Sequence, residues 1–102
     1  MIMERIKRIQ NMERSLDASR LAVDRLAKAL EAYESVQKEL KKLSDYYGSS
    51  LWREDFEADE RGELPSDLKR GVLSEDAVYD LLTDDHELGL RMKKVSARTL
   101  EG

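Results

Sequence analysis

The chain has 102 residues, of which 39% are charged and 40% hydrophobic, and its formal net charge is −4. A chain of this length forms one domain, so we expect a single helical domain over residues 1–102. Cysteine is absent, which excludes a disulfide framework, a thiolate zinc site and a thiol nucleophile.

Charge and hydropathy argue against membrane and nucleic-acid partners. The longest stretch without a charged residue, Tyr46–Trp52, is far shorter than the roughly 18 residues of a membrane span. The N-terminus is charged from Glu4 onward and has no apolar signal core. Acidic residues dominate from Glu54 to Glu87, whereas a nucleic-acid surface shows a basic stripe. We therefore expect a cytoplasmic protein with no membrane and no nucleic-acid partner.

Residues 1–47 contain neither glycine nor proline, and their apolar residues recur with a spacing near 3.5. Most positions of the predicted seam are apolar: the a sites are Ile2, Ile9, Leu16, Val23, Leu30, Gln37 and Ser44, and the d sites are Arg5, Met12, Ser19, Leu26, Tyr33, Leu40 and Tyr47. The pattern predicts one long, coiled-coil-like helix. Gly48 is expected to end it in the left-handed conformation. Cap-type residues in Ser15–Ser19 leave a break there as an alternative.

The next segment, residues 48–73, is predicted to hold a short helix and turns. Ser50 is expected to cap a helix that continues to about Glu60, and Gly62 is expected to end it. Pro65 then begins a turn.

A last helix is predicted over residues 74–98. Ser74 is its expected cap, and the acidic Glu75 and Asp76 favour the positive end of the helix dipole. The polar run at residues 83–85 makes a break near residue 83 an alternative. The predicted fold class is all-α, with this helix packed back antiparallel on the long one as a helical hairpin or bundle.

The predicted helix lengths do not match. A helix over residues 1–47 would be about 70 Å long, whereas one over residues 74–97 would reach about 36 Å. The shorter helix would leave the N-terminal part of the apolar stripe uncovered. We therefore expect self-association, most simply as a homodimer, through the residues of that part: Ile2, Ile6, Ile9, Met12 and Leu16.

Aromatic and charged residues gather in the segment 46–71. The candidates for a partner or ligand surface are Tyr46, Tyr47, Trp52, Asp55, Phe56, Asp59 and Arg70. One interpretation is a small structural core. The other is a binding groove with Trp52 as its anchor, because tryptophan and tyrosine dominate binding hot spots. The sequence leaves both open.

Catalytic and cofactor motifs are missing from the sequence. The alternating acids of residues 55–62 lack the glycine and the bidentate glutamate that a calcium loop needs. His86 is the only histidine, and there is no glycine-rich phosphate loop or nucleophile elbow. We expect no cofactor, no metal site and no enzymatic activity.

The block from Tyr46 to Tyr79 contains the pattern W-x-x-D-F-E-x-D-E followed by L-P-x-D-L-K-R-G-V-L-S-E-D. It resembles a family of small, uncharacterised bacterial proteins, a domain of unknown function with the same long N-terminal helix. The resemblance implies a bacterial, cytoplasmic, helical protein and supplies no activity. It directs attention to Tyr46, Tyr47, Trp52, Asp55, Phe56, Asp59, Leu64, Pro65, Asp67, Arg70 and Gly71.

Two functions follow as hypotheses. The first is a non-catalytic helical module for protein–protein interaction, acting as an oligomeric scaffold or adaptor. The alternative is a small-ligand or metal-binding protein that uses the aromatic and acidic segment 46–71.

Overall fold

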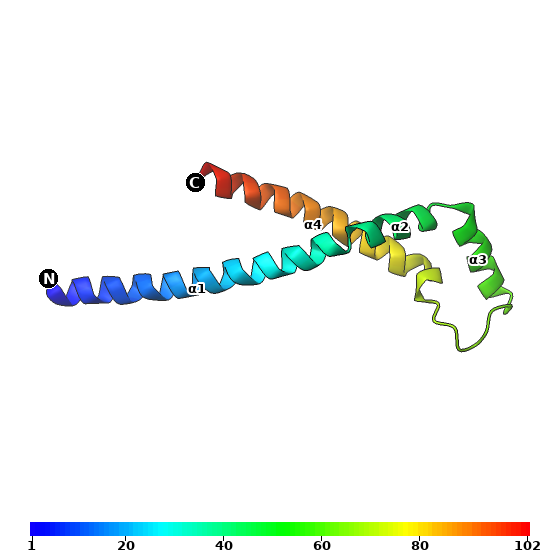
Figure 1. Cartoon of the computed structure of the whole chain (residues 1–102), viewed down its shortest axis with the longest axis horizontal. Coiled ribbons are helices and arrows are strands. Elements are labelled where there is room, and N and C mark those ends of the chain that lie inside the picture. Colours follow the sequence, from blue (N-terminus) through cyan, green and yellow to red (C-terminus); the bar gives the residue numbers. More distant parts are fainter. The chain divides into compact units, whose positions relative to one another are not determined.

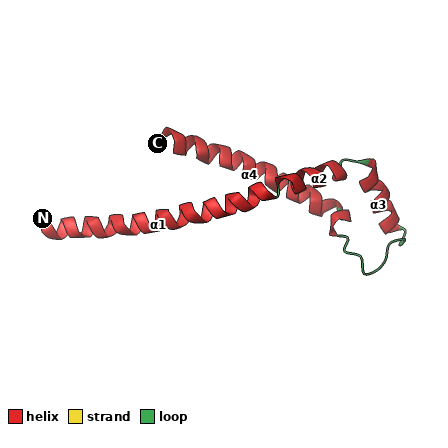
Figure 2. Cartoon of the chain, viewed as in Figure 1, coloured by secondary structure: helices red, strands yellow, loops and turns green.

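A computed structural model describes all 102 residues and confirms the all-α class (Figures 1 and 2). The elements in chain order are α1 (Ile2–Ser35), α2 (Gln37–Tyr47), α3 (Ser50–Glu60), the 3₁₀ turn η1 (Gly71–Leu73) and α4 (Glu75–Glu101). The chain divides into two compact units, residues 1–38 and residues 39–102. Each is described by itself below.

The first unit consists almost entirely of α1. This helix passes through Ser15–Ser19 without interruption, so the alternative break there is not found. None of its residues is buried. A single helix cannot cover its own apolar stripe, and every stripe residue of α1 is exposed except Tyr33, which is half-buried.

The helix expected over residues 1–47 is interrupted at Val36, which corrects the prediction of one continuous element. The backbone N–H of Val36 donates to the carbonyl of Tyr33 at 3.2 Å, in the tighter i,i−3 pattern. The side-chain amide of Gln37 donates to the same carbonyl at 3.1 Å. A side chain that enters the backbone ladder in this way bends or breaks a helix.

The second unit begins with most of α2 and a tight link into α3. Gly48 follows α2 as predicted, but it does not adopt the left-handed conformation that we expected. The hydroxyl of Ser49 instead donates to the carbonyl of Tyr46 at 2.6 Å and accepts the N–H of Trp52 at 3.4 Å. Ser49, and not Ser50, is therefore the cap of α3.

Gly62 terminates α3 as predicted. It is the only residue with a positive φ, 71°. Its N–H donates to the carbonyl of Asp59, and the N–H of Glu63 donates to that of Ala58, both at 3.0 Å. This pair of bonds is the Schellman motif, which satisfies the last carbonyls of a helix and favours glycine at the left-handed position.

Helix α4 begins at the predicted cap, because the hydroxyl of Ser74 accepts the N–H of Ala77 at 3.4 Å. It continues to Glu101 with no break near residue 83. It is thus one unbroken helix and extends past the predicted end at residue 98. The antiparallel packing of residues 74–98 on residues 1–47 stays a prediction.

The core of the second unit is small. Three hydrophobic side chains are buried, namely Trp52 from α3, Leu73 from η1 and Val78 from α4. The turn η1 lies against both α3 and α4, so these three residues join the separate elements of the unit. Every other large apolar side chain is partly or fully exposed.

Candidate functional site

An aromatic cluster lies at the centre of the second unit. The ring of Trp52 stacks on Phe56, with centroids 5.1 Å apart and planes at 15°. The edge of Tyr47 meets Trp52 at 5.0 Å and 72°. Both geometries are among those that aromatic rings prefer. The cluster therefore joins the end of α2 to one face of α3.

Hydrogen bonds extend the cluster to the rest of the unit. The indole N–H of Trp52 donates to the carbonyl of Val72 at 2.9 Å. The hydroxyl of Tyr47 donates to the carbonyl of Glu75, in the first turn of α4, at 3.2 Å. Since Trp52 is only 8% exposed, it offers little surface to a partner, and its position agrees with the structural interpretation of the segment.

Tyr46 has a different partner from Tyr47 and pairs with Asp55. Its hydroxyl donates to the carboxylate at 2.5 Å, linking α2 to α3. The hydrogen bond, together with partial burial and the negative charge of Asp55, raises the pKa of Tyr46 to about 12. The phenol is therefore held in its neutral, donating form.

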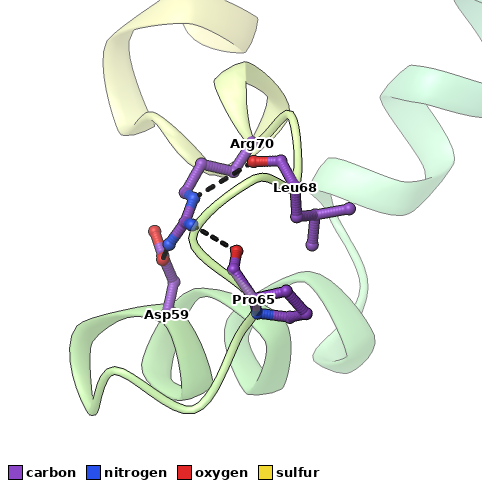
Figure 3. A network of polar contacts seen from close by, with 4 residues as sticks. All are labelled: Asp59, Pro65, Leu68 and Arg70. Atoms are coloured by element: carbon purple, nitrogen blue, oxygen red, sulfur yellow. Dashed lines mark hydrogen bonds and ion pairs between the residues drawn. The ribbon is translucent and has the colours of Figure 1, made fainter.

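Arg70 ties the loop between α3 and η1 to the end of α3 (Figure 3). Its guanidinium forms an ion pair with Asp59. It also donates from Nη2 to the carbonyl of Pro65 at 2.6 Å and from Nε to that of Leu68 at 3.4 Å. Both members of the ion pair are about one-quarter to one-third exposed. All three guanidinium nitrogens are engaged, so Arg70 organises the loop.

A shallow groove of about 270 Å³ separates the Tyr46–Asp55 pair from this loop. The residues that line it are Tyr46, Asp55, Leu64, Leu68, Lys69, Arg70, Val72 and Leu73. Its volume lies just below the roughly 300–1,000 Å³ of typical ligand pockets. The groove combines an apolar floor with one acid–phenol pair and two basic side chains.

The structure brings together all seven candidates from the aromatic and acidic segment, in two groups. Tyr46, Asp55 and Arg70 line the groove, and Asp59 forms an ion pair with Arg70. The other three form the aromatic cluster: Tyr47, Trp52 and Phe56. Sequence reasoning did not single out Leu68 and Val72, whose only signal is an apolar side chain within a turn-rich segment.

The five residues predicted for self-association lie elsewhere, in the first unit. Ile2, Ile6, Ile9, Met12 and Leu16 are 70%, 43%, 52%, 59% and 58% exposed. They occupy one stripe of α1 by their spacing. They belong to the first unit, whereas all the residues that line the groove belong to the second.

Two further properties bear on the chemistry of the molecule. No group of three or more histidine, cysteine or acidic side chains is placed to hold a metal ion. No helix is both long enough and apolar enough to cross a bilayer.

These elements define an all-α protein with a long exposed helix and a small unit built around an aromatic cluster. The chain belongs to a family described as a domain of unknown function, DUF4298, whose pattern matches residues 9–95. The match covers the stripe of α1 from Ile9 onward as well as the aromatic cluster and the groove. No curated protein and no solved structure matches the chain.

Proposed function

We propose that this protein is a non-catalytic helical module that self-associates through α1 and serves as an oligomeric scaffold or adaptor for other proteins. One observation carries the proposal: an apolar stripe extends along a 34-residue helix in which no residue is buried. Contiguous exposed apolar surface of this extent is typical of an interaction site.

The energetics support a covered stripe. Burial of a large aliphatic side chain contributes about 1.5–3 kcal/mol, and five such side chains line the N-terminal part of α1 alone. The intrinsic helix propensity of its residues stabilises an isolated helix only slightly. Most of the stability of helices in proteins comes from burying their apolar face. A partner helix would supply that burial.

The second unit would then present the partner surface. Of the three core residues only Leu73 lines the groove, so a partner could contact Tyr46, Asp55 and the loop without displacing Trp52 or Val78. The proposal places the protein in the bacterial cytoplasm, in keeping with the absence of cysteine and with the resemblance of the Tyr46–Tyr79 block.

One pair of substitutions tests the role of the stripe. Leu16 and Leu21 lie on the same helix with similar exposed fractions, 58% and 49%, but only Leu16 occupies a seam position. Leu16→Lys should weaken self-association at least tenfold in sedimentation velocity, whereas Leu21→Lys should leave it unchanged. Equal sedimentation of both variants and the unsubstituted chain as monomers would refute the proposal.

The groove supports the alternative function to a lesser degree. Its apolar residues, Leu64, Leu68, Val72 and Leu73, together with the amine of Lys69, suit a small acidic organic molecule. A ligand of this class should raise the thermal melting temperature of the unsubstituted chain and should fail to do so after Leu68→Glu, which places a repelling negative charge in the groove. If no compound in a broad metabolite panel shifts the melting temperature, the alternative fails.

A further inference from the structure

The stripe of α1 is not uniformly apolar, and its exceptions carry information about the partner. Within the helix, Arg5 and Ser19 occupy d positions among aliphatic and aromatic neighbours. A partner must accept both in the seam. The chain itself offers a stripe of matching length and period, so a second copy is the partner to consider.

A parallel, in-register pair of copies fits these exceptions poorly. Each seam residue would then face its own counterpart, so that Arg5 would meet a second Arg5 and Ser19 a second Ser19. A layer here means the two seam residues that face each other across the pair. The Arg5 layer would set two positive charges against each other, and the Ser19 layer would bury two hydroxyls together. Polar residues at seam positions are known to select register and orientation at a cost in stability.

An antiparallel pair fits them well. With Ile9 opposite Leu26 of the partner subunit, Arg5 lies opposite Leu30 and Ser19 lies opposite Leu16 of the partner subunit. The remaining layers join Met12 to Val23 and Ile2 to Tyr33, by the same two-fold symmetry. Every layer of the seam then contains at least one large apolar side chain, and no layer contains two polar ones.

The residues that flank the seam select this register. Reversal of one helix brings the e positions of the two copies together. Glu13 and Arg20, both e residues, then face each other across the seam, twice by symmetry. A shift of one heptad in one direction would set Glu13 against its own copy, and a shift in the other would set Arg20 against its own copy. Both shifts replace attraction by repulsion.

Two other features of the single helix are compatible with this pairing. Of the g positions on the opposite flank, Ser15, Ala22 and Ala29 hold small residues, which allow close approach of the backbones, and Arg8 would lie opposite Ala29 of the partner subunit. Arg20 also contacts Asp24 of its own helix at 3.8 Å, with both side chains largely exposed. A guanidinium has several donors, so it can keep this contact while reaching Glu13 of the partner subunit.

We infer that α1 pairs with α1 of a second copy as an antiparallel two-stranded coiled coil, with its two-fold axis between Asp17 and Ala18 and its register set by Glu13 and Arg20. The inference rests on the proposed self-association and adds its orientation and register. The C-terminal ends of the two α1 helices would then lie at opposite ends of the pair.

Cysteine cross-linking of the full chain tests the arrangement, because the natural sequence contains no cysteine. The double variant Ile9→Cys/Leu26→Cys is equilibrated in a glutathione buffer and mapped by peptide mass spectrometry. We expect disulfides between residues 9 and 26 of different copies. Either single variant should form no disulfide within the dimer, since its two cysteines would be about 25 Å apart along the axis.

Charge reversal provides the second readout. Glu13→Arg alone and Arg20→Glu alone should each weaken the dimer several-fold, and the double variant Glu13→Arg/Arg20→Glu should restore it. Disulfides joining 9 to 9 and 26 to 26, or a double variant no tighter than the single ones, would overturn the antiparallel register while leaving self-association intact. A monomeric unsubstituted chain would overturn both this inference and the proposed function.

Discussion

The indole N–H of Trp52 donates to the carbonyl of Val72 across 20 residues of sequence, at 2.9 Å. This bond joins α3 to η1, and the residue after Val72 is the buried Leu73. The only tryptophan of the chain therefore serves as the centre of a core that contains few other buried side chains. The stability of the second unit therefore depends on Trp52.

Replacement of Trp52 should destabilise the second unit severely. Trp52→Ala removes the stacked ring and the hydrogen bond, and large-to-small changes of this kind cost about 3–5 kcal/mol. Far-UV circular dichroism during urea unfolding would measure the loss. The neighbouring Leu51 is 60% exposed, so Leu51→Ala should change the free energy of unfolding by less than about 0.5 kcal/mol. Equal effects of the two substitutions would contradict a core role for Trp52.

Arg70 should not be replaceable by lysine. Arg70→Lys keeps the positive charge but loses the planar guanidinium that contacts Asp59 and the carbonyls of Pro65 and Leu68. The free energy of unfolding should fall by about 1–3 kcal/mol. The matched control is Arg61→Lys, since Arg61 also makes two hydrogen bonds, to Glu63, but both of those side chains are more than half exposed. Surface pairs contribute little, so the control should be nearly silent in the same unfolding experiment. If Arg70→Lys left the free energy of unfolding unchanged, the loop would be held by other contacts.

The pair of Tyr46 and Asp55 predicts a pH dependence. The folded-state pKa of Tyr46, about 12, lies above the value of about 10 for an unfolded tyrosine. The hydrogen bond therefore stabilises the fold fully below pH 10 and loses its contribution as the pH rises toward 12. Absorbance of tyrosinate should show one late-titrating group that Tyr46→Phe abolishes. In Asp55→Asn, the loss of the neighbouring charge should lower its midpoint. A late group that survives Tyr46→Phe would assign the shift to another tyrosine.

Two glycines should respond to alanine with opposite signs. Gly62 has a φ of 71°, so Gly62→Ala should destabilise α3 by about 1–2 kcal/mol. Gly89 lies inside α4, and nothing lies within 4 Å of the position that its Cβ would take. Gly89→Ala should therefore stabilise that helix by roughly 0.5–1 kcal/mol. Thermal melting of the two variants would measure both changes. The same sign for both would contradict the backbone conformation at Gly62.

The sequence predicted the elements better than the points where they meet. Absence of glycine and proline together with heptad spacing was enough to find the long helix, and Gly62 and Ser74 were found from their cap chemistry. The break at Val36 was missed because it arises from one glutamine side chain that competes for one carbonyl. Ser49 and Ser50 have identical side chains, and only the backbone conformation of Ser49 decides which of them caps α3.

The candidate site could be located but not interpreted from sequence. The segment 46–71 was distinguished by its aromatic and charged composition. Its division into a core and a groove depends on bonds between distant residues, such as Trp52 with Val72 and Tyr47 with Glu75. Leu68 and Val72 lie at the groove because the contacts of Arg70 with Asp59, Pro65 and Leu68 fold the loop toward α3. No local sequence pattern predicts that geometry.

We propose above that a second copy of the chain covers the stripe of α1. Size-exclusion chromatography with multi-angle light scattering on the unsubstituted protein, at micromolar concentration, measures whether it does. We expect a molar mass twice that of the 11.8 kDa chain. A single peak at 11.8 kDa that persists as the loading concentration is raised would contradict it.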